Sequence, residues 1–317
     1  MIKQLLICTL LFSFSINGQK NKKLASIFSD YPADLTSIGL AKRISNDFSS
    51  NKERAEAAFF WVANTIKYNL FAYKNPNSKV IGFRYLDEED KKRKILAIQD
   101  SIVVHTLKTK KAVCEGYART LSKIYTHLGL ENIVVKGFVR NSIHDIGKEQ
   151  EVSNHVWNLV KIDNDWKIVD ATWAAGSVTN GIWKQSYNDY YYDIPRRHYL
   201  KTHFPENSQW KFGNKISKEE FYHQPIYSSE FLQKNFELIK PLHGIISKRK
   251  SKELILEIKN LTSIESVFYA VSTSKYAQKP EITYRNNVGY IKIKSFKKSN
   301  HLYVLINKQI YLEFKLI

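Results

Sequence analysis

Residues 111–118 read KAVCEGYA and lead into a segment with helical periodicity. Apolar side chains recur every three or four positions from Tyr117 to Leu128, and Gly129 follows as a natural stop, so we predict a helix that begins at Cys114. The N-terminus of a helix presents backbone N–H groups and a partial positive charge, and both favour the reactive thiolate over the thiol. Cys114 is therefore a candidate nucleophile, although the commoner role of a lone cysteine is that of a small buried apolar side chain.

A base and a carboxylate follow in a predicted hairpin. Segments 155–162 and 166–173 alternate like strands, and the Asp163-Asn164-Asp165 sequence between them is typical of a turn. A two-residue turn places His155 and Asp170 diagonally across one face of the hairpin, roughly 7 Å apart. A three-residue turn without a bulge would place them on opposite faces.

In that geometry His155 is the candidate base and Asp170 the group that orients it. Asp170 would accept a hydrogen bond from one ring nitrogen, so that the other nitrogen faces Cys114. The structural alternatives are a surface histidine at a strand end and a carboxylate beside a turn. Three further residues are candidate substrate contacts. Gly116 would leave room for a substrate backbone, and Trp157 and Trp173 would line the cleft or pack in the core.

The N-terminus is typical of a secretory signal peptide, which we predict over residues 1–18. Lys3 precedes an apolar run from Leu5 to Ile16, and Gly18 supplies a small residue at its end. The run is too short for a permanent membrane span, and no later stretch is long and apolar enough for one. We expect an exported protein, whether in a periplasm, at the cell surface or outside the cell.

Composition limits the function classes further. Hydrophobic residues make up 43% of the 317 residues and aromatic residues 13%, which is typical of a packed globular protein. The net charge of +19 is compatible with an anionic partner, but export argues against nucleic acid and favours a solvated surface. With the second cysteine inside the signal, a single cysteine remains, and neither a His-Glu-x-x-His motif nor paired cysteines are present, so we predict no metal and no cofactor.

Elsewhere the pattern predicts helices followed by consecutive strands, an α+β arrangement with an antiparallel sheet. Residues 53–67 have helical spacing, with Asn51 as the candidate cap, and residues 133–139 alternate like a strand. The charged residues 74–100 are interpreted as an exposed loop or short helix.

Short strands dominate the C-terminal region and predict a small β-sandwich over residues 236–317, after a larger domain over residues 19–235. The predicted strands are Leu254–Ile258, Val267–Val271, Tyr290–Ile293, Leu302–Ile306 and Ile310–Phe314.

Together, the segment around Cys114, residues 154–158 (NHVWN) and residues 169–173 (VDATW) resemble the transglutaminase-like superfamily. The resemblance covers roughly residues 50–215 and includes the helix before the cysteine segment. Ala112 departs from it, since glycine is usual at that position. The resemblance implies a papain-like fold, with the cysteine on the central helix and the histidine and aspartate on the sheet.

A narrower resemblance follows in residues 196–200 (RRHYL), residues 203–206 (HFPE) and Trp210. This segment is similar to the kyphoscoliosis-peptidase and cytokinesis-protein branch of the superfamily, in which it leads from the core to β-sandwich modules. Some members of that branch have lost catalytic residues, whereas this sequence keeps all three.

These observations favour acyl transfer through a thioester on Cys114, with a protein or peptide as substrate. Water as the acceptor gives hydrolysis, which the resemblance favours, and a lysine amine gives a crosslink. The main alternative is a non-catalytic binding or scaffold protein of the cell envelope, whose components would then be its partners.

Overall fold

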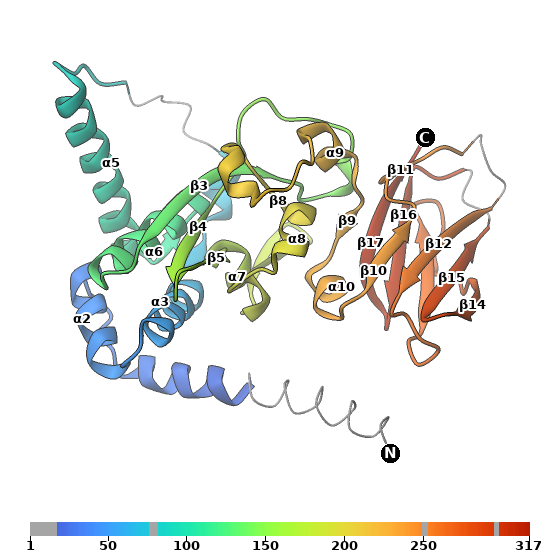
Figure 1. Cartoon of the computed structure of the whole chain (residues 1–317), viewed down its shortest axis with the longest axis horizontal. Helices are drawn as coiled ribbons and strands as arrows, with labels where there is room; N and C mark the ends of the chain where they lie inside the picture. The colour runs from blue at the N-terminus through green and yellow to red at the C-terminus, as the bar shows by residue number, and fades with distance from the viewer. Residues whose placement is uncertain (1–17, 76–81, 249–252, 295–297) are drawn as a thin grey trace. The chain divides into compact units, whose positions relative to one another are not determined.

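The computed structural model describes residues 18–75, 82–248, 253–294 and 298–317 (Figure 1). Apart from Gly18, the predicted signal peptide lies outside these residues. The chain forms two compact units, one from the segment up to Val134 with Val156–Asp193, the other from Val135–His155 with Ile194–Ile317. The domain boundary near residue 236 stays a prediction. Within the described ranges, no helix is long and apolar enough to cross a membrane.

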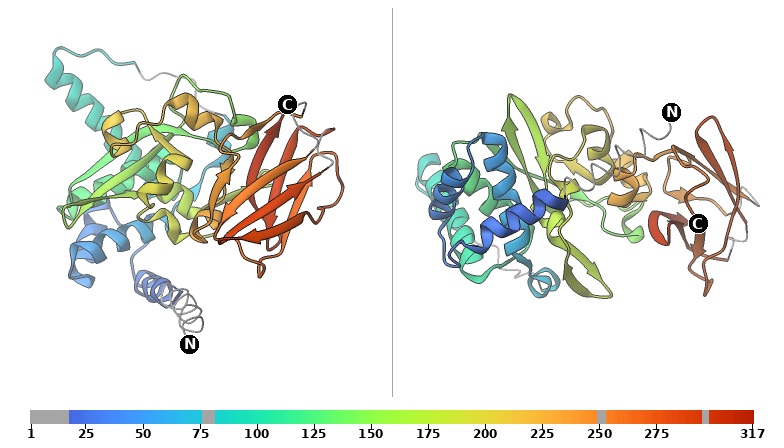
Figure 2. Two further views of the ribbon diagram at one scale, coloured as in Figure 1. Left: turned by 45° about the vertical axis from the view of Figure 1, so that its right-hand side comes forward. Right: turned by 90° about the horizontal axis from the view of Figure 1, so that it is seen from below.

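Helices form one layer of the first unit. Residues 18–29 are helical and are followed by α2 (Ser37–Asp47), α3 (Asn51–Thr65), α4 (Leu70–Lys74), α5 (Glu88–Thr109) and α6 (Cys114–His127). As predicted, α3 is apolar on nearly every side and buried. Its cap is Ser50 rather than Asn51, because Ser50 and Glu53 form a reciprocal capping box. Figure 2 shows α3 and α6 on the same side of strands β3 and β4.

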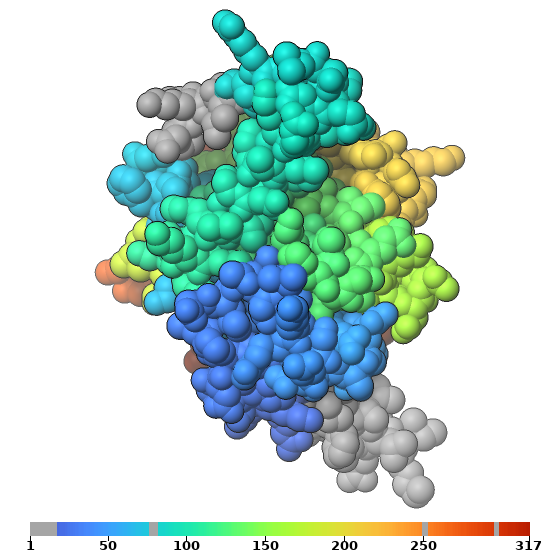
Figure 3. All heavy atoms as spheres, turned by 90° about the vertical axis from the view of Figure 1, so that its left-hand side faces the viewer, coloured from blue at the N-terminus to red at the C-terminus, as the bar shows by residue number. Residues whose placement is uncertain are grey.

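Helix α5 replaces the predicted loop or short helix. Asp87 caps its first turn, and the lysines and arginine that follow pair with acidic residues three or four positions earlier. Most of its side chains face solvent, and in Figure 3 it forms much of the teal surface. The prediction was wrong because a charged helix with a narrow buried stripe lacks strong hydrophobic periodicity.

The sheet that carries the predicted hairpin has four strands in the order β5-β4-β3-β8. These are β3 (Asn132–Val139), β4 (His155–Ile162), β5 (Asp165–Val169) and β8 (His203–Pro205). Ile162 pairs with Asp165, which confirms the two-residue turn. Asp163 and Asn164 both have positive φ, as a type I′ hairpin turn requires.

The second strand of the hairpin is shorter than predicted. β5 ends at Val169, and Asp170 caps a short helix, α7 (Ala171–Ala175). The prediction of a strand as far as Trp173 was wrong because Asp170 bonds to the backbone N–H groups that follow it and turns the chain into a helix.

Shorter elements complete the part before the C-terminal sheets. They are the parallel pair β1 (Lys67–Tyr68) and β2 (Lys111–Ala112), the hairpin β6 (Gly176–Thr179) and β7 (Ile182–Gln185), the 3₁₀ turns Ile143–Asp145, Asp189–Tyr191 and Ser208–Lys211, the helices α8 (Arg196–Thr202), α9 (Lys218–His223) and α10 (Ser229–Gln233), and β9 (Ile226–Tyr227).

The C-terminal strands form two largely antiparallel sheets, as the α+β fold class with a C-terminal β-sandwich predicts. One sheet has the order β10-β12-β15-β14 and the other the order β11-β17-β16-β13. The strands are β10 (Glu237–Lys240), β11 (Ile245–Ile246), β12 (Leu254–Lys259), β13 (Val267–Val271), β14 (Glu281–Arg285), β15 (Val288–Ile293), β16 (His301–Ile306) and β17 (Gln309–Leu316). Buried and partly exposed positions alternate along β13, β15 and β16, so one face of each builds the core.

Candidate active site

Cys114 is the first residue of α6, a helix of 14 residues. Its thiol is free and half-buried. In the described structure the N-cap residue Val113 makes no side-chain hydrogen bond to the helix. The backbone N–H groups of the first turn of α6 can therefore bind an anion. The preceding strand β2 is fixed by β1, through bonds from the Lys67 and Asn69 N–H groups to the carbonyls of Lys110 and Ala112.

Tyr68 links Cys114 electrostatically to Asp170. Burial is the main cause that raises the pKa of the Tyr68 hydroxyl well above its ordinary value, and electrostatic interactions with Cys114, Tyr73 and Asp170 raise it further. Cys114 and Asp170 therefore lie within electrostatic range of one phenol oxygen. Tyr68 stays neutral at physiological pH, with an O–H able to donate a hydrogen bond.

Asp170 is fully buried at the end of β5. Its Oδ1 atom accepts hydrogen bonds from the backbone N–H groups of Thr172 at 2.9 Å and Trp173 at 3.1 Å. These bonds hold the carboxylate in one orientation and stabilise its charged form.

His155 is the first residue of β4 and is 5% exposed. The chain before it is held to β3, because the Asn154 side chain bonds to both the N–H and the carbonyl of Val139, each at 2.9 Å. The chain after it is held to α6, since the Asn158 amide donates to the carbonyl of Ala118 at 3.0 Å. The strand that begins at His155 and the helix that begins at Cys114 are thus tied together.

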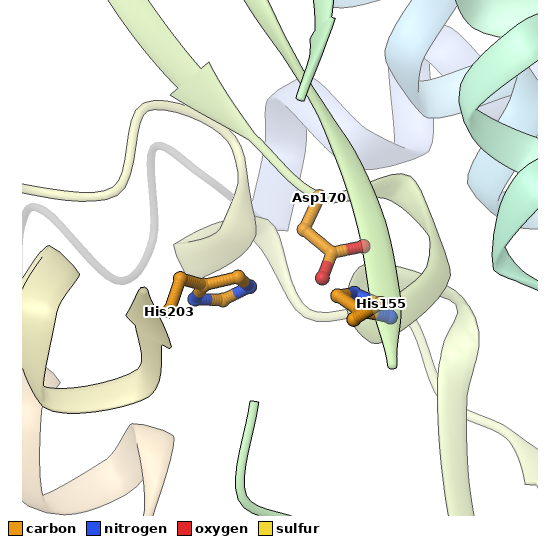
Figure 4. Close-up of side chains that lie close together, drawn as sticks. All are labelled: His155, Asp170 and His203. Atoms are coloured by element: carbon orange, nitrogen blue, oxygen red, sulfur yellow. The ribbon is translucent and has the colours of Figure 1, made fainter. Parts of the chain in front are cut away.

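His155, Asp170 and His203 lie close together (Figure 4). Each residue has one polar atom, a ring nitrogen or a carboxylate oxygen, that lies within 4.8 Å of such an atom in each of the other two residues. The sheet explains the cluster, because β4 and β8 both begin, and β5 ends, near the Val139 end of β3. The rings of His155 and His203 have centroids 5.8 Å apart.

Comparisons with known proteins identify the family of the domain that carries these residues. Residues 38–171 match the family model of the transglutaminase-like superfamily. Residues 38–171 therefore form a transglutaminase-like domain. Its predicted helix, cysteine segment, histidine strand and aspartate all lie within the matched span.

Curated relatives belong to the branch suggested by the sequence. Human "Kyphoscoliosis peptidase" is 24% identical over 231 residues, 68% of this chain and 32% of that protein. "Lim and transglutaminase domain protein ltd-1" of Caenorhabditis elegans is 23% identical over 157 residues, 45% of this chain and 22% of that protein. This chain thus spans about a third of the length of the first of these relatives.

Two matches cover less of the chain or superpose loosely. "Cytokinesis protein 3" of Schizosaccharomyces pombe is 32% identical over 81 residues, 25% of this chain and 9% of that protein. A solved structure titled "Crystal structure of a TGase" is 21% identical and covers 55% of this chain and 36% of that chain, with a TM-score of 0.31.

Gly116 lies in a closely packed part of this transglutaminase-like domain, two residues after the cysteine. A Cβ atom at this position would lie 2.5 Å from the Ala112 Cβ and 2.7 Å from the Thr106 Oγ1. Close packing of α6 against β2 and α5 therefore explains this glycine. Its predicted contact with substrate stays a prediction.

The two candidate tryptophans have different surroundings. Trp157 is 1% exposed and is one of the largest fully buried side chains, so a core position explains it without a substrate. Trp173 is half-buried and meets Tyr191 edge-on at 5.5 Å between ring centroids. Of the two, Trp173 remains the candidate for lining a cleft.

No sequence pattern predicted a role for His203, which lies in the segment similar to the kyphoscoliosis-peptidase branch. His203 is fully buried, its Nδ1 lies 2.8 Å from the Thr202 hydroxyl, and its ring stacks on Tyr199. The available signal was the placement of a histidine at the start of an apolar segment, His203-Phe204-Pro205, after a short helix. Only the sheet order reveals that this segment lies beside β3.

Proposed function

We propose that this protein is an exported thiol-dependent acyl-transfer enzyme that hydrolyses peptide or amide bonds. Cys114 is the nucleophile, His155 the base and Asp170 the group that orients the base. The observation that carries the proposal is the placement of His155 and Asp170 in one buried cluster, with Asp170 fixed by two backbone N–H groups.

The first half-reaction forms a thioester. His155 takes the proton of the Cys114 thiol, and the sulfur attacks the substrate carbonyl carbon. The carbonyl oxygen carries negative charge in the tetrahedral intermediate, and the N–H groups of the first turn of α6 are positioned to stabilise such a charge. When the C–N bond breaks, the leaving amine takes the proton from His155.

The second half-reaction regenerates the thiol. His155 takes a proton from water, the resulting hydroxide attacks the thioester, and the acid and the Cys114 thiol are released. The same base would activate a lysine amine and give a crosslink instead. The name of the human relative, which is called a peptidase, favours water as the acceptor.

Labelling of Cys114 by iodoacetamide tests the proposed thiolate. At mildly acidic pH the wild type should react on the order of 10-fold or more faster than His155→Ala, because a neighbouring imidazolium lowers the pKa of a thiol. His144→Ala is the matched control, since His144 is an exposed histidine outside the cluster. If the His155 variant labels as fast as the wild type, the protein is a non-catalytic binding or scaffold protein of the kind outlined above.

Substrate screens then separate the acceptors. A peptide library and a glutamine donor with a labelled amine are each incubated with wild type and Cys114→Ser. Hydrolysis that is lost in the variant supports the proposal, whereas amine incorporation without hydrolysis would replace it by a crosslinking transglutaminase.

A further inference from the structure

A cavity of about 450 Å³ lies between helix α8 and the paired ends of strands β10 and β12. Every residue that lines it belongs to the second compact unit. Its volume falls within the range of about 300–1,000 Å³ that is typical of small-molecule sites. Arg197 and Lys201 line the cavity from one face of α8, because residues four positions apart on a helix lie on the same side. Lys259 lines it from the end of β12.

The lining carries an excess of positive charge. Three cations, Arg197, Lys201 and Lys259, face the single carboxylate of Glu237, which leaves a net charge of +2. Glu237 is paired with Lys259 across the two strands, with 3.7 Å between the carboxylate oxygen and Nζ. Within the described ranges, the two cations of α8 therefore have no carboxylate partner.

The Arg197 guanidinium is held in place by neutral groups. Its Nε donates to His198 Nε2 at 3.1 Å, and its Nη2 donates to Asn235 Oδ1 at 2.9 Å. These bonds fix the side chain without neutralising its charge, and they leave further N–H groups of the guanidinium for an oxyanion. The Asn235 side-chain amide makes no hydrogen bond through its nitrogen to any residue that the structure describes, so it offers another donor.

The Lys201 side chain is half-buried, and its ammonium lies over the ring of Tyr227 at 5.2 Å. In the described part of the chain this ammonium makes no hydrogen bond and no ion pair. Burial is the main cause that lowers the pKa of Lys201; the charge of Glu237 opposes the shift, and that of Arg197 adds to it. An anion bound between Lys201 and Arg197 would remove their mutual repulsion.

We propose that this cavity binds the phosphate group of a small phosphorylated molecule. A phosphate monoester carries a charge of about −1.5 to −2 at neutral pH, which matches the two cations without a carboxylate partner, whereas a carboxylate would neutralise only one of them. The planar fork of Arg197 suits two oxygens of a phosphate. A cavity of this volume also has room for an organic part beside Phe236 and the Asn235 amide. The site lies outside the thiol chemistry and does not depend on it.

Binding is measured by calorimetric titration of the wild-type chain with glycerol phosphate, inorganic phosphate and acetate at low ionic strength. Acetate should bind on the order of 10-fold more weakly than phosphate, because it carries half the charge. Glycerol phosphate should bind about 3-fold or more tighter than phosphate, because its hydroxyl groups can bond the Asn235 amide. Acetate that binds as tightly as phosphate would overturn the proposal.

The same titrations distinguish the sources of the phosphate group. Phosphate that binds as tightly as its glycerol ester would replace the organic ligand by the free ion. Sedimentation of the protein with vesicles of phosphatidic acid, if it falls in Lys201→Met, would replace the soluble ester by a lipid headgroup. Binding of the ester without either result supports the small molecule.

Two substitutions in α8 test the cations. Lys201→Met keeps an unbranched chain over Tyr227 and removes the charge, so affinity for glycerol phosphate should fall on the order of 10-fold or more. Arg197→Lys keeps the charge and removes the fork, and should also lose about 10-fold. Lys215→Met is the matched control, since Lys215 is an exposed lysine of the same unit outside the cavity. It should bind like the wild type.

Glu237→Gln should have the opposite effect and raise the affinity for glycerol phosphate about 3-fold or more, because removal of the carboxylate frees Lys259 for the anion. A variant that folds poorly cannot produce such a gain. Thermal denaturation of each variant confirms that the compared proteins are folded. Unchanged affinity in both α8 variants, an equal loss in Lys215→Met, or a loss in Glu237→Gln would overturn the site.

Discussion

The transglutaminase-like part and the C-terminal sheets differ in what they bury. Among the described residues, Ser299 is the buried polar side chain of the C-terminal sheets, and the remaining buried polar or charged side chains lie between Asp90 and His203. The C-terminal core consists of aliphatic and aromatic side chains such as Leu256, Ile291 and Phe314.

This contrast separates stability from chemistry. A buried polar group costs free energy unless it is hydrogen-bonded, so a part of the chain that keeps many of them has a use for them. In the proposed function His155 and Asp170 serve the site, whereas Arg140 and Asn158 hold elements that surround it. Substitutions of the proposed site residues should therefore lower activity, whereas substitutions in the C-terminal core should lower the free energy of unfolding.

The largest effect is expected from Asp170→Asn. The amide preserves the cap of α7, so the free energy of unfolding should change by about 1 kcal/mol or less. Turnover should fall roughly 10³–10⁴-fold, because an amide no longer holds the base in the correct tautomer. Peptide hydrolysis and chemical denaturation, measured on the same sample, check both statements.

Asp90→Asn is the matched control for that variant. Asp90 is also a buried carboxylate, but it pairs with Arg93 and Lys94 at the start of α5. It should lose stability and keep turnover. Equal losses of turnover in the two variants would remove Asp170 from the proposed mechanism.

Phe314→Ala should show the opposite pattern. Phe314 is fully buried on β17, and replacing a buried phenylalanine by alanine costs about 3–5 kcal/mol of unfolding free energy. The labelling rate of Cys114 per folded molecule should remain that of the wild type. A changed rate under fully native conditions would mean that the C-terminal sheets act on the site directly.

Arg140→Met tests a buried charge with a structural role. The Arg140 guanidinium donates to the carbonyls of Gln224, Pro225 and Lys201 and lies over the ring of Phe221. Burial lowers its pKa to about 10, which still leaves it charged at neutral pH. Methionine fills a similar volume but leaves the carbonyls without donors, so unfolding free energy should fall by about 2–4 kcal/mol.

The readout for Arg140 is chemical denaturation, with Arg196→Met as a surface control. Arg196 lies on α8 and its guanidinium covers the ring of Phe212. Its loss should cost about 1 kcal/mol or less. If the two variants lose equal stability, the three carbonyl bonds of Arg140 contribute little.

Local patterns predicted the elements that carry the site. The helix from Cys114, the strand from His155 and the two-residue turn all follow from apolar spacing and turn residues, and the structure has each of them. The end of β5 was not predictable in this way, because Asp170 in an apolar strand pattern does not reveal that its side chain will cap the next helix.

Contacts between distant segments were not predictable from spacing. His203 comes near His155 because β8 pairs with β3 through Val139, a pairing that depends on the whole sheet order. Helix α5 was missed for a different reason, since its stability comes from caps and charge pairs rather than from an apolar stripe. Both failures are places where tertiary packing or electrostatics outweighed local hydrophobic pattern.

The smallest effect is expected from His198, a buried histidine on α8 whose role is structural. Burial, followed by the positive charges of Arg197 and Lys201, lowers its pKa to about 4. Arg197 Nε donates to His198 Nε2 at 3.1 Å, a bond that requires the neutral ring. The unfolded chain, with an ordinary pKa near 6.5, binds the proton first as pH falls. The stability associated with the neutral ring is therefore complete above about pH 6.5 and is lost as pH falls toward 4.

Denaturation of wild type and His198→Gln across that range isolates this contribution from other acid effects. The difference in unfolding free energy between the two should be up to about 3 kcal/mol larger at pH 7 than at pH 4. A pH-independent difference would mean that His198 titrates normally. That result would also weaken the contrast between the two regions. A histidine that can be protonated in the folded state without a free-energy cost needs no special role to explain its burial.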